Sequence, residues 1–225
     1  MTGTLYLVST PIGNLNDITI RAIDILNSVD TILTEDTRVT HKLLKHHAVK
    51  TKSSLQSFNQ INEDKKAPKI ILALKEGKDI ALVSDAGTPL ISDPGYKFIK
   101  HARENSIRVE PVPGCCALIA AITSSGLPSD KFTFQGFLPR TANKRINELN
   151  KLNHKEETLI FYESVHRIQS SIEDMINVFG GRRPAVVCKE ITKMHELFIG
   201  ETLSDISQYF ENNKEIHIQT NLICG

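Results

Sequence analysis

The feature that most constrains the fold is the apolar run Ile80–Val83, which stops at a loop rich in glycine and proline. An uninterrupted apolar run of this length is typical of a strand buried on both faces of a parallel sheet. The loop, residues 84–95, carries two carboxylates, Asp85 and Asp93, together with three hydroxyl side chains. Open α/β sheets bind ligands at the carboxyl ends of their strands, so we expect a ligand site here. Each aspartate could instead cap the next helix, but two in one turn favour a ligand.

Three further strands are expected to end in polar loops at the same edge of the sheet. They are the runs Thr4–Ser9, Thr31–Thr34 and Ile107–Glu110. The first is followed by a glycine turn and a helix, which Asn16 or Asp17 can cap. This order is typical of a nucleotide-binding unit, yet neither G-x-G-x-x-G nor G-x-x-x-x-G-K-[ST] occurs. The sequence therefore argues against an ATP or NAD pyrophosphate site.

The segment between Thr37 and Asn62 contains no acidic residue and includes a helix whose outer face is basic. Val39, Leu43 and Leu44 give that helix an apolar inner face. Its outward basic residues include Arg38, Lys42 and Lys45. Such a face is either simply solvated or contacts a phosphate backbone, and the pattern leaves both interpretations open. Its histidines have no cysteine or carboxylate beside them, so no metal site is predicted.

Charge, cysteines and the start of the chain exclude several classes of protein. The 27 lysine and arginine residues nearly balance the 26 aspartate and glutamate residues, so no global field points to nucleic acid or membrane. The four cysteines lack metal-ligand spacing, and the vicinal pair Cys115 and Cys116 is poorly suited to a disulfide. No apolar run is long enough to span a bilayer, and a strand rather than a leader peptide comes first. We therefore expect a cytoplasmic protein without a membrane partner.

A hinge is predicted at residues 126–130, where Gly-Leu-Pro-Ser-Asp interrupts the pattern of helices and strands. It would separate an N-terminal α/β lobe, residues 1–126, from a C-terminal α/β lobe, residues 127–225. The first sheet is expected to be mainly parallel and the second mixed. Because strand ends of both lobes deliver polar loops, we expect the ligand in the cleft between the lobes.

Three functions are compatible with these residues taken alone. Exposed carbonyls and carboxylates suit a cationic ligand, of which the sulfonium of S-adenosylmethionine is one example. Asp85 and Asp93 could instead hold Mg²⁺ in a phosphohydrolase, since hard cations bind carboxylate oxygens. A non-enzymatic RNA-binding module that uses the basic helix is the third interpretation.

Seven short motifs, in this order along the chain, resemble those of one enzyme family. They occupy residues 10–14, 35–38, 84–89, 92–95, 136–139, 161–167 and 190–193. Each motif alone is weak, but the set covers nearly the whole chain. It closely resembles the bacterial small-subunit rRNA cytidine-2′-O-methyltransferases, which are class III, tetrapyrrole-methylase-like S-adenosylmethionine methyltransferases.

The resemblance implies a two-lobed tetrapyrrole methylase-like α/β fold with S-adenosylmethionine in the interlobe cleft. The implied substrate is the ribose of a decoding-region cytidine in 16S rRNA, within the assembled small ribosomal subunit. A homodimer is also implied. A methyltransferase of the same class that acts on a tetrapyrrole is the closest alternative.

The resemblance further implies the donor contacts, and the chemistry of methyl transfer to an RNA hydroxyl suggests the candidate bases and phosphate contacts. Donor contacts are expected from Pro11, Asp85, Ala86, Gly87, Thr88, Cys116, Ala117 and Tyr162. The bases that could accept the ribose hydroxyl proton are Asp36, Asp93, Glu163 and His166. Glu35 and Asp36 could instead orient Arg38 in a structural ion pair. RNA phosphate contacts are expected from Arg38, Lys42, Lys45, Arg140, Lys144 and Arg167.

The chain departs from the family pattern at three places. Residues 59–63 read Asn-Gln-Ile-Asn-Glu, where the family has an H-x-H-N-E-like segment. Val165 stands where a proline is usual before His-Arg. Residues 214–222 depart from the usual ending, and family members continue further, so we expect a truncated or divergent end of the second lobe.

Overall fold

The computed structural model describes residues 2–50, 53–164, 166–213 and 221–224. The chain divides into two compact units, Met1–Cys116 and Ala117–Gly225, and each is described by itself. Helix α5 (Ala117–Ser124) and the segment predicted as a hinge therefore both belong to the second unit. Two of the departures noted in the sequence, Val165 and most of the carboxyl-terminal segment, lie outside the described residues.

The first unit is built on a parallel five-stranded sheet with the order β3-β2-β4-β1-β5. Its strands are β1 (Thr4–Val8), β2 (Thr31–Thr34), β3 (Ser54–Ser57), β4 (Ile80–Val83) and β5 (Arg108–Val112). All four residues of the central strand β4 are buried, as its apolar run predicts. Because the strands run in one direction, their carboxyl ends meet at one edge of the sheet. The predicted parallel sheet is confirmed.

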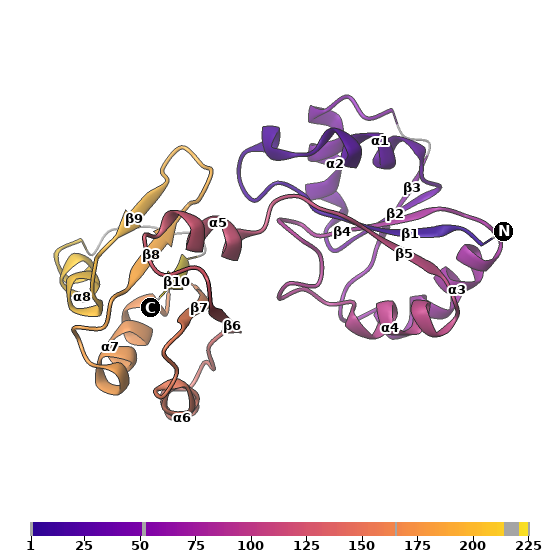
Figure 1. Ribbon diagram of the computed structural model, residues 1–225. Helices are drawn as coiled ribbons and strands as arrows, with labels where there is room; N and C mark the ends of the chain where they lie inside the picture. The colour runs from indigo at the N-terminus through magenta and orange to yellow at the C-terminus, as the bar shows by residue number, and fades with distance from the viewer. Residues whose placement is uncertain (1, 51–52, 165, 214–220, 225) are drawn as a thin grey trace. The chain divides into compact units, whose positions relative to one another are not determined.

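Helices cover both faces of this sheet (Figure 1). They are α1 (Ile20–Ser28) and α2 (Thr37–His46) on one face, and α3 (Glu63–Lys75) and α4 (Tyr96–Glu104) on the other. Alternate residues of β4 mark the two sides. Ala81 and Val83 belong to the cluster with α1 and α2, whereas Ile80 and Leu82 belong to the cluster with α3 and α4. Burial on both sides is why β4 carries no polar residue.

The start of α1 differs from the prediction. Leu15–Asp17 form a separate short 3-10 turn, η1, and α1 begins only at Ile20. Thr19 is its N-cap, because the Thr19 hydroxyl accepts a hydrogen bond from the Ala22 N–H at 3.1 Å. The prediction of Asn16 or Asp17 as the cap was therefore wrong: a later residue of the same capping class takes that position.

The second unit has a mixed sheet with the order β6-β7-β10-β8-β9. Its strands are β6 (Phe132–Phe137), β7 (Thr158–Glu163), β8 (Val186–Lys189), β9 (Leu197–Ile199) and β10 (Asn221–Cys224). β6 and β7 are parallel, and the remaining neighbours are antiparallel. The predicted mixed sheet is confirmed.

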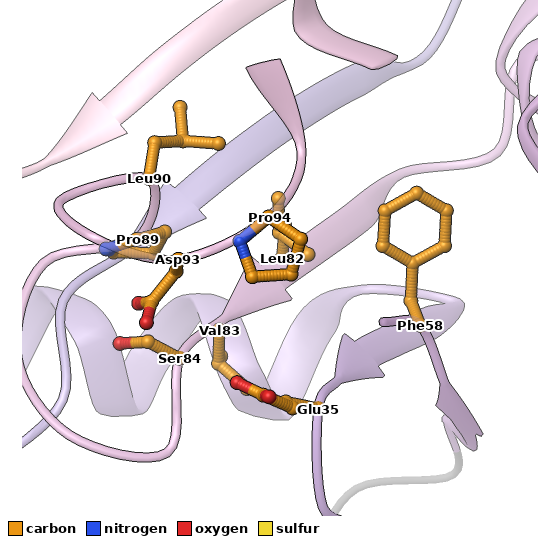
Figure 2. Close-up of a pocket in the computed structure, with 9 residues that line it drawn as sticks. All are labelled: Glu35, Phe58, Leu82, Val83, Ser84, Pro89, Leu90, Asp93 and Pro94. Atoms are coloured by element: carbon orange, nitrogen blue, oxygen red, sulfur yellow. The ribbon is translucent and has the colours of Figure 1, made fainter. Parts of the chain in front are cut away.

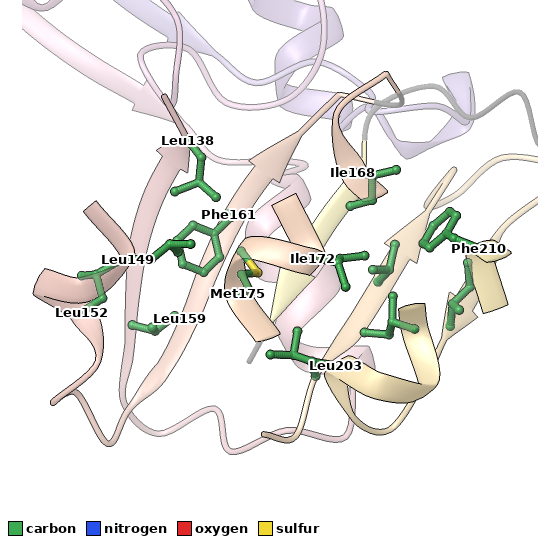
Figure 3. Close-up of a cluster of buried hydrophobic side chains, with 14 residues drawn as sticks. Leu138, Leu149, Leu152, Leu159, Phe161, Ile168, Ile172, Met175, Leu203 and Phe210 are labelled. Carbon is green, nitrogen blue, oxygen red and sulfur yellow. The ribbon is translucent and has the colours of Figure 1, made fainter. Parts of the chain in front are cut away.

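One face of this second sheet packs against three helices in a single apolar cluster (Figure 3). The helices are α6 (Ala142–Leu152), α7 (Ile168–Phe179) and α8 (Leu203–Asn212). Phe161 of β7, which is 1% exposed, lies at the sheet side of the cluster. The buried Arg145 pairs with Asp174 at 2.6 Å and fastens α6 to α7.

None of the helices in the described part of the chain has the length and apolar character that crossing a bilayer requires.

Candidate functional site

The loops after β1 and β4 are joined by backbone hydrogen bonds. The Thr10 N–H donates to the Gly87 carbonyl at 2.9 Å, and the Gly87 N–H donates to the Thr10 carbonyl at 3.0 Å. The Ser84 hydroxyl donates to the same Gly87 carbonyl at 2.6 Å. The Thr10 hydroxyl donates to the Ser84 carbonyl at 3.1 Å. The loops after these two neighbouring strands therefore form one hydrogen-bonded surface, which we call the ledge and which comprises Thr10, Ser84 and Gly87.

Thr88 extends this ledge to the loop after β5. Its hydroxyl donates to the Cys115 carbonyl at 2.9 Å and lies 3.1 Å from the Ser9 hydroxyl. Gly87 and Thr88, which were predicted to contact a donor, thus lie in this ledge, and Pro11 and Cys116 directly follow Thr10 and Cys115 in the chain. Ser9 and Thr10 were not among the predicted residues. The signal for them was their place at the end of β1.

Gly87 has a backbone conformation that requires glycine. Its φ is +88°, in the left-handed region that side chains disfavour. A Cβ built there would lie 3.2 Å from Cγ2 of Ile12 and 3.7 Å from the Cys115 carbonyl oxygen. The ledge is therefore shaped by a glycine that lets the loops after β1, β4 and β5 approach one another.

Three carboxylates gather at the carboxyl ends of β2 and β4. Burial raises the pKa of Asp93 to about 6, and the negative charges of Glu35 and Asp85 contribute to that rise. Burial also raises the pKa of Glu35 and of Asp85, again with like charges adding to it. None of the three forms a salt bridge within the part of the chain that the structure describes. The group is therefore poised to take up a proton or a cation.

A small pocket holds two of these carboxylates. Glu35 and Asp93 line it together with Ser84, and Phe58 and Leu82 contribute apolar walls (Figure 2). Its volume of about 10 Å³ has room for about one water molecule. The loop that closes it is strained, because Leu90 and Ser92 have φ values of 74° and 68°. Strain of this kind at non-glycine residues is concentrated in active sites and ligand clamps.

Asp36 has a structural role that the sequence left open. Its carboxylate accepts from the Arg38 backbone N–H at 2.8 Å, which caps α2. It also accepts from the Arg38 guanidinium, with the closest contact at 2.6 Å. These bonds lower the pKa of Asp36 to about 2. The predicted ion pair of Asp36 and Arg38 is present, and it makes Asp36 a poor base.

Glu163, also predicted as a base, is enclosed in the second unit. Its side chain is fully buried and forms a 2.6 Å salt bridge with Arg167. The Ser164 N–H and the Ser171 hydroxyl donate to the same carboxylate at 2.7 and 2.6 Å. The Arg167 guanidinium also donates to the Leu138 carbonyl at 3.1 Å. Both side chains are therefore held by neighbouring residues, and the pair joins β7 to the start of α7.

The remaining predicted residues are placed as follows. Tyr162 is half-buried in β7, and its ring lies 4.9 Å from that of Phe134 and 5.7 Å from that of Phe137. Ala117 is the first residue of α5. The other predicted side chains are exposed: Lys42 and Lys45 on α2, Lys144 on α6, and Ala86, Arg140 and His166 in loops.

The described residues contain no group of three or more histidine, cysteine, aspartate or glutamate side chains placed to hold a metal ion. Glu35, Asp85 and Asp93 are near enough to raise one another's pKa, but they do not form such a group.

Comparison with known proteins gives consistent relationships over almost the whole chain. Residues 4–207 match the family model described as Tetrapyrrole (Corrin/Porphyrin) Methylases. The chain is 50% identical over 202 residues to a Vibrio cholerae protein named Ribosomal RNA small subunit methyltransferase I, covering 90% of this chain and 69% of the relative. A Halalkalibacterium halodurans protein of the same name is 47% identical over 203 residues, with the same coverages.

The fold is shared with solved structures at low sequence identity. The cobalamin biosynthetic enzyme cobalt precorrin-4 methyltransferase aligns with a TM-score of 0.71 and 18% identity, covering 99% of this chain and 94% of that one. Uroporphyrin-III C-methyltransferase from Thermus thermophilus, complexed with S-adenyl homocysteine, aligns with a TM-score of 0.66 and 17% identity, covering 99% and 97%. These similarities confirm the predicted fold class.

Proposed function

This chain belongs to the tetrapyrrole (corrin/porphyrin) methylase family, and from that premise we propose that it methylates the 2′-hydroxyl of a cytidine ribose in 16S rRNA. The enzyme is an S-adenosylmethionine-dependent rRNA methyltransferase. The observation that carries this is its 50% identity, over 90% of its length, to a protein named Ribosomal RNA small subunit methyltransferase I; the cytidine ribose is the part that we propose from the motif resemblance. The tetrapyrrole enzymes share only 17–18% of its residues, so they support the fold and not a tetrapyrrole substrate.

The ledge of the first unit suits this methyl donor. When bound, S-adenosylmethionine supplies a methyl group on a positively charged sulfonium. Glu35, Asp85 and Asp93 give this end of the sheet an excess of negative charge that Arg38 offsets only in part, which favours a cationic ligand. Gly87 and Thr88 hold the backbone of the ledge in place. We propose the residues from Asp85 to Thr88, with Pro11 and Cys116, as donor contacts of the first unit, and Ala117 and Tyr162 as those of the second.

Asp93 is the base that we propose for the ribose hydroxyl. A carboxylate with a pKa of about 6 is ionised at neutral pH and is a stronger base than an ordinary aspartate. Of the other predicted bases, Asp36 is held by Arg38 and Glu163 is buried against Arg167. His166 is exposed in a loop and stays a second choice. Since the reaction is an in-line displacement, alignment of hydroxyl and donor supplies much of the acceleration.

The proposed substrate is 16S rRNA within the assembled small ribosomal subunit. We propose that the cytidine lies in the decoding region of the small ribosomal subunit and that the enzyme works in the cytoplasm as a homodimer. Lys42, Lys45, Arg140 and Lys144 are exposed and are proposed to contact RNA phosphates. Changing Lys42, Lys45 and Lys50 together to alanine tests the basic face of α2. An unchanged salt dependence of RNA binding would assign those lysines to a solvated face.

Methylation of ribosomal subunits tests the proposed function directly. Small subunits from a bacterial strain that lacks its own enzyme are incubated with this protein and S-adenosylmethionine, and 16S rRNA fragments are analysed by mass spectrometry. We expect one methyl group on the ribose of one cytidine. A methyl group on a base, or methylation of a tetrapyrrole substrate but not of RNA, would contradict the proposal.

Two controls test donor binding and the form of the RNA substrate separately. Calorimetric titration with S-adenosylmethionine measures donor binding without any RNA, and absence of binding removes the methyltransferase assignment. Protein-free 16S rRNA replaces the assembled subunit in a parallel reaction. Equal rates on both substrates would contradict the preference for the assembled particle but leave the chemistry intact.

A further inference from the structure

A second recess of the first unit lies apart from the carboxylate pocket. It runs between α3 and the edge strand β3 and has a volume of about 740 Å³. Its walls come from one stripe of α3, from alternate residues of β3, and from the amino-terminal ends of β2 and β4. The residues of this groove used below are Ser54, Gln56, Lys65, Lys66, Lys69 and Lys78.

The helical repeat places three of the groove's lysines on one side of α3. Lys65, Lys66 and Lys69 lie within four residues of one another, and the spacings of three and four place Lys69 beside both others on one side of α3. The opposite stripe, which includes Ile71 and Leu74, is buried in the core. Lys78 joins them from the turn before β4. Four ammonium groups therefore line one recess, although the whole chain is nearly neutral.

Of three carboxylates near this groove, Glu63 and Asp64 are held by contacts outside it, and Asp30 lines it against four lysines. Glu63 is buried and accepts from the Phe98 N–H at 3.0 Å. Asp64 faces Lys97 of α4 at 3.9 Å. Asp30 lines the groove, and its carboxylate accepts from the Asp79 N–H at 2.8 Å. Among the described residues, none of the four lysines forms a salt bridge. The groove thus has an unbalanced positive charge that favours an anion.

The groove also offers neutral hydrogen-bonding groups and leads toward the carboxylate pocket. Ser54 and Gln56 line it from β3, and Asn62 lines it from the start of α3. Just beyond β3 stands Phe58, which lines the pocket that holds Asp93. Hydroxyl and amide side chains beside several lysines are the usual donors to phosphate and ribose oxygens. A polyanionic strand in the groove would therefore run along β3 toward the pocket.

We propose that this lysine groove binds the phosphodiester backbone of an RNA strand on one side of the methylated nucleotide. The inference rests on the proposed rRNA substrate and adds a binding surface separate from the basic face of α2. Lys66 donates to the Ser57 carbonyl and so holds the wall of the groove. Lys65 and Lys69 are exposed, and they make the direct phosphate contacts.

The test is the double variant Lys65→Ala/Lys69→Ala, compared with Lys75→Ala/Arg103→Ala. The second variant removes the same charge from exposed positions of α3 and α4 that do not line the groove. Binding to small ribosomal subunits is measured across a range of salt concentrations. Each lost phosphate contact lowers the slope of log K against log salt by roughly 0.7 to 0.9. We expect the groove variant to lose about 1.5 in slope and the control variant almost nothing.

Three further measurements keep this proposal separate from the proposed function. Donor affinity by calorimetry and the far-ultraviolet circular dichroism spectrum should match wild type in both variants. If wild type neither binds nor methylates ribosomal subunits, the proposed function fails before the groove is tested. If wild type is active and the two variants show the same salt slope, the groove does not bind RNA. The charge-reversal variant Lys65→Glu/Lys69→Glu should weaken binding further, and wild-type affinity in that variant would also overturn the proposal.

Discussion

The backbone N–H of Asp36 donates to Oδ1 of Asp85 at 3.0 Å, and this bond joins the loop after β2 to the loop after β4. It holds one acidic loop against another. The bond lowers the pKa of Asp85, yet burial outweighs it and the pKa stays raised. The cluster of Glu35, Asp85 and Asp93 is therefore kept together against electrostatic repulsion, which a bound cation would relieve.

Replacement of Asp93 by asparagine tests the proposed base. The substitution Asp93→Asn keeps the size of the side chain and removes its ability to accept the ribose proton, so we expect kcat to fall at least about 100-fold. Donor affinity should change by less than about fivefold, because the other carboxylates remain. Single-turnover methylation and calorimetric titration measure the two effects. In wild type, the rate should rise with pH through about 6 and then level off. If the variant keeps the wild-type kcat, Asp93 is not the base, and His166 or water accepts the proton.

The same substitution has a predicted effect on stability. The folded-state pKa of Asp93 is raised from 3.8 to about 6, so its favourable contribution exists below pH 3.8 and is lost as the pH rises through 6. At pH 7 the ionised Asp93 therefore destabilises the free protein. After allowance for solvent screening, we expect Asp93→Asn to raise the free energy of unfolding by about 1 kcal/mol.

Urea denaturation at pH 7 and pH 4 measures this difference. The gain should be present at the higher pH and nearly absent at the lower one. A gain of equal size at both values would mean that burial does not hold the pKa of Asp93 above its ordinary range.

The carboxylate of Glu163 is predicted to stabilise the second unit rather than to act on substrate. Glu163→Ala leaves Arg167 partly buried without its partner, and such a loss typically costs about 3 kcal/mol. Arg167→Ala should cost a similar amount, and the double variant should cost less than the sum because the two residues are coupled. Urea denaturation of the three variants gives the coupling energy. Strict additivity would contradict a direct interaction of the pair.

The sequence predicted the elements whose pattern is strong. Ile80–Val83 is the buried central strand that its apolar run predicted. The short edge strand β3 was not predicted, because Ser-Leu-Gln-Ser has a single apolar residue and an edge strand needs only one buried face. Strand order, and hence which loops become neighbours, depends on contacts between distant residues that no local pattern encodes.

The sequence predicted the region of the site but could not rank the individual site residues. The strand-end rule placed Asp85 and Asp93 in one region, since it depends only on parallel strands. It could not separate Asp93 from Glu163, because in the sequence both are carboxylates at or after the end of a predicted strand. Burial distinguishes them: the Glu163 side chain is fully buried between Arg167 and Ser171 of α7, and the Ser171 contact forms only when α7 packs on β7. The lysine groove was missed because its residues are dispersed over α3, β3 and the turn before β4.

The ledge between the loops after β1 and β4 is predicted to depend on the glycine at position 87. Gly87→Ala places a Cβ at φ +88°, 3.2 Å from Ile12, so backbone strain and crowding both act. We expect a loss of about 2 kcal/mol in stability and a weaker donor affinity, because the Thr10–Gly87 bridge must shift. Gly126→Ala is the matched control, since Gly126 has a φ of +77° and no atom within 4 Å of the added Cβ. It should cost only the backbone strain, about 1 kcal/mol. Urea denaturation and calorimetric titration with S-adenosylmethionine compare the two, and equal losses with unchanged donor affinity would show that the close approach at Gly87 has no part in shaping the site.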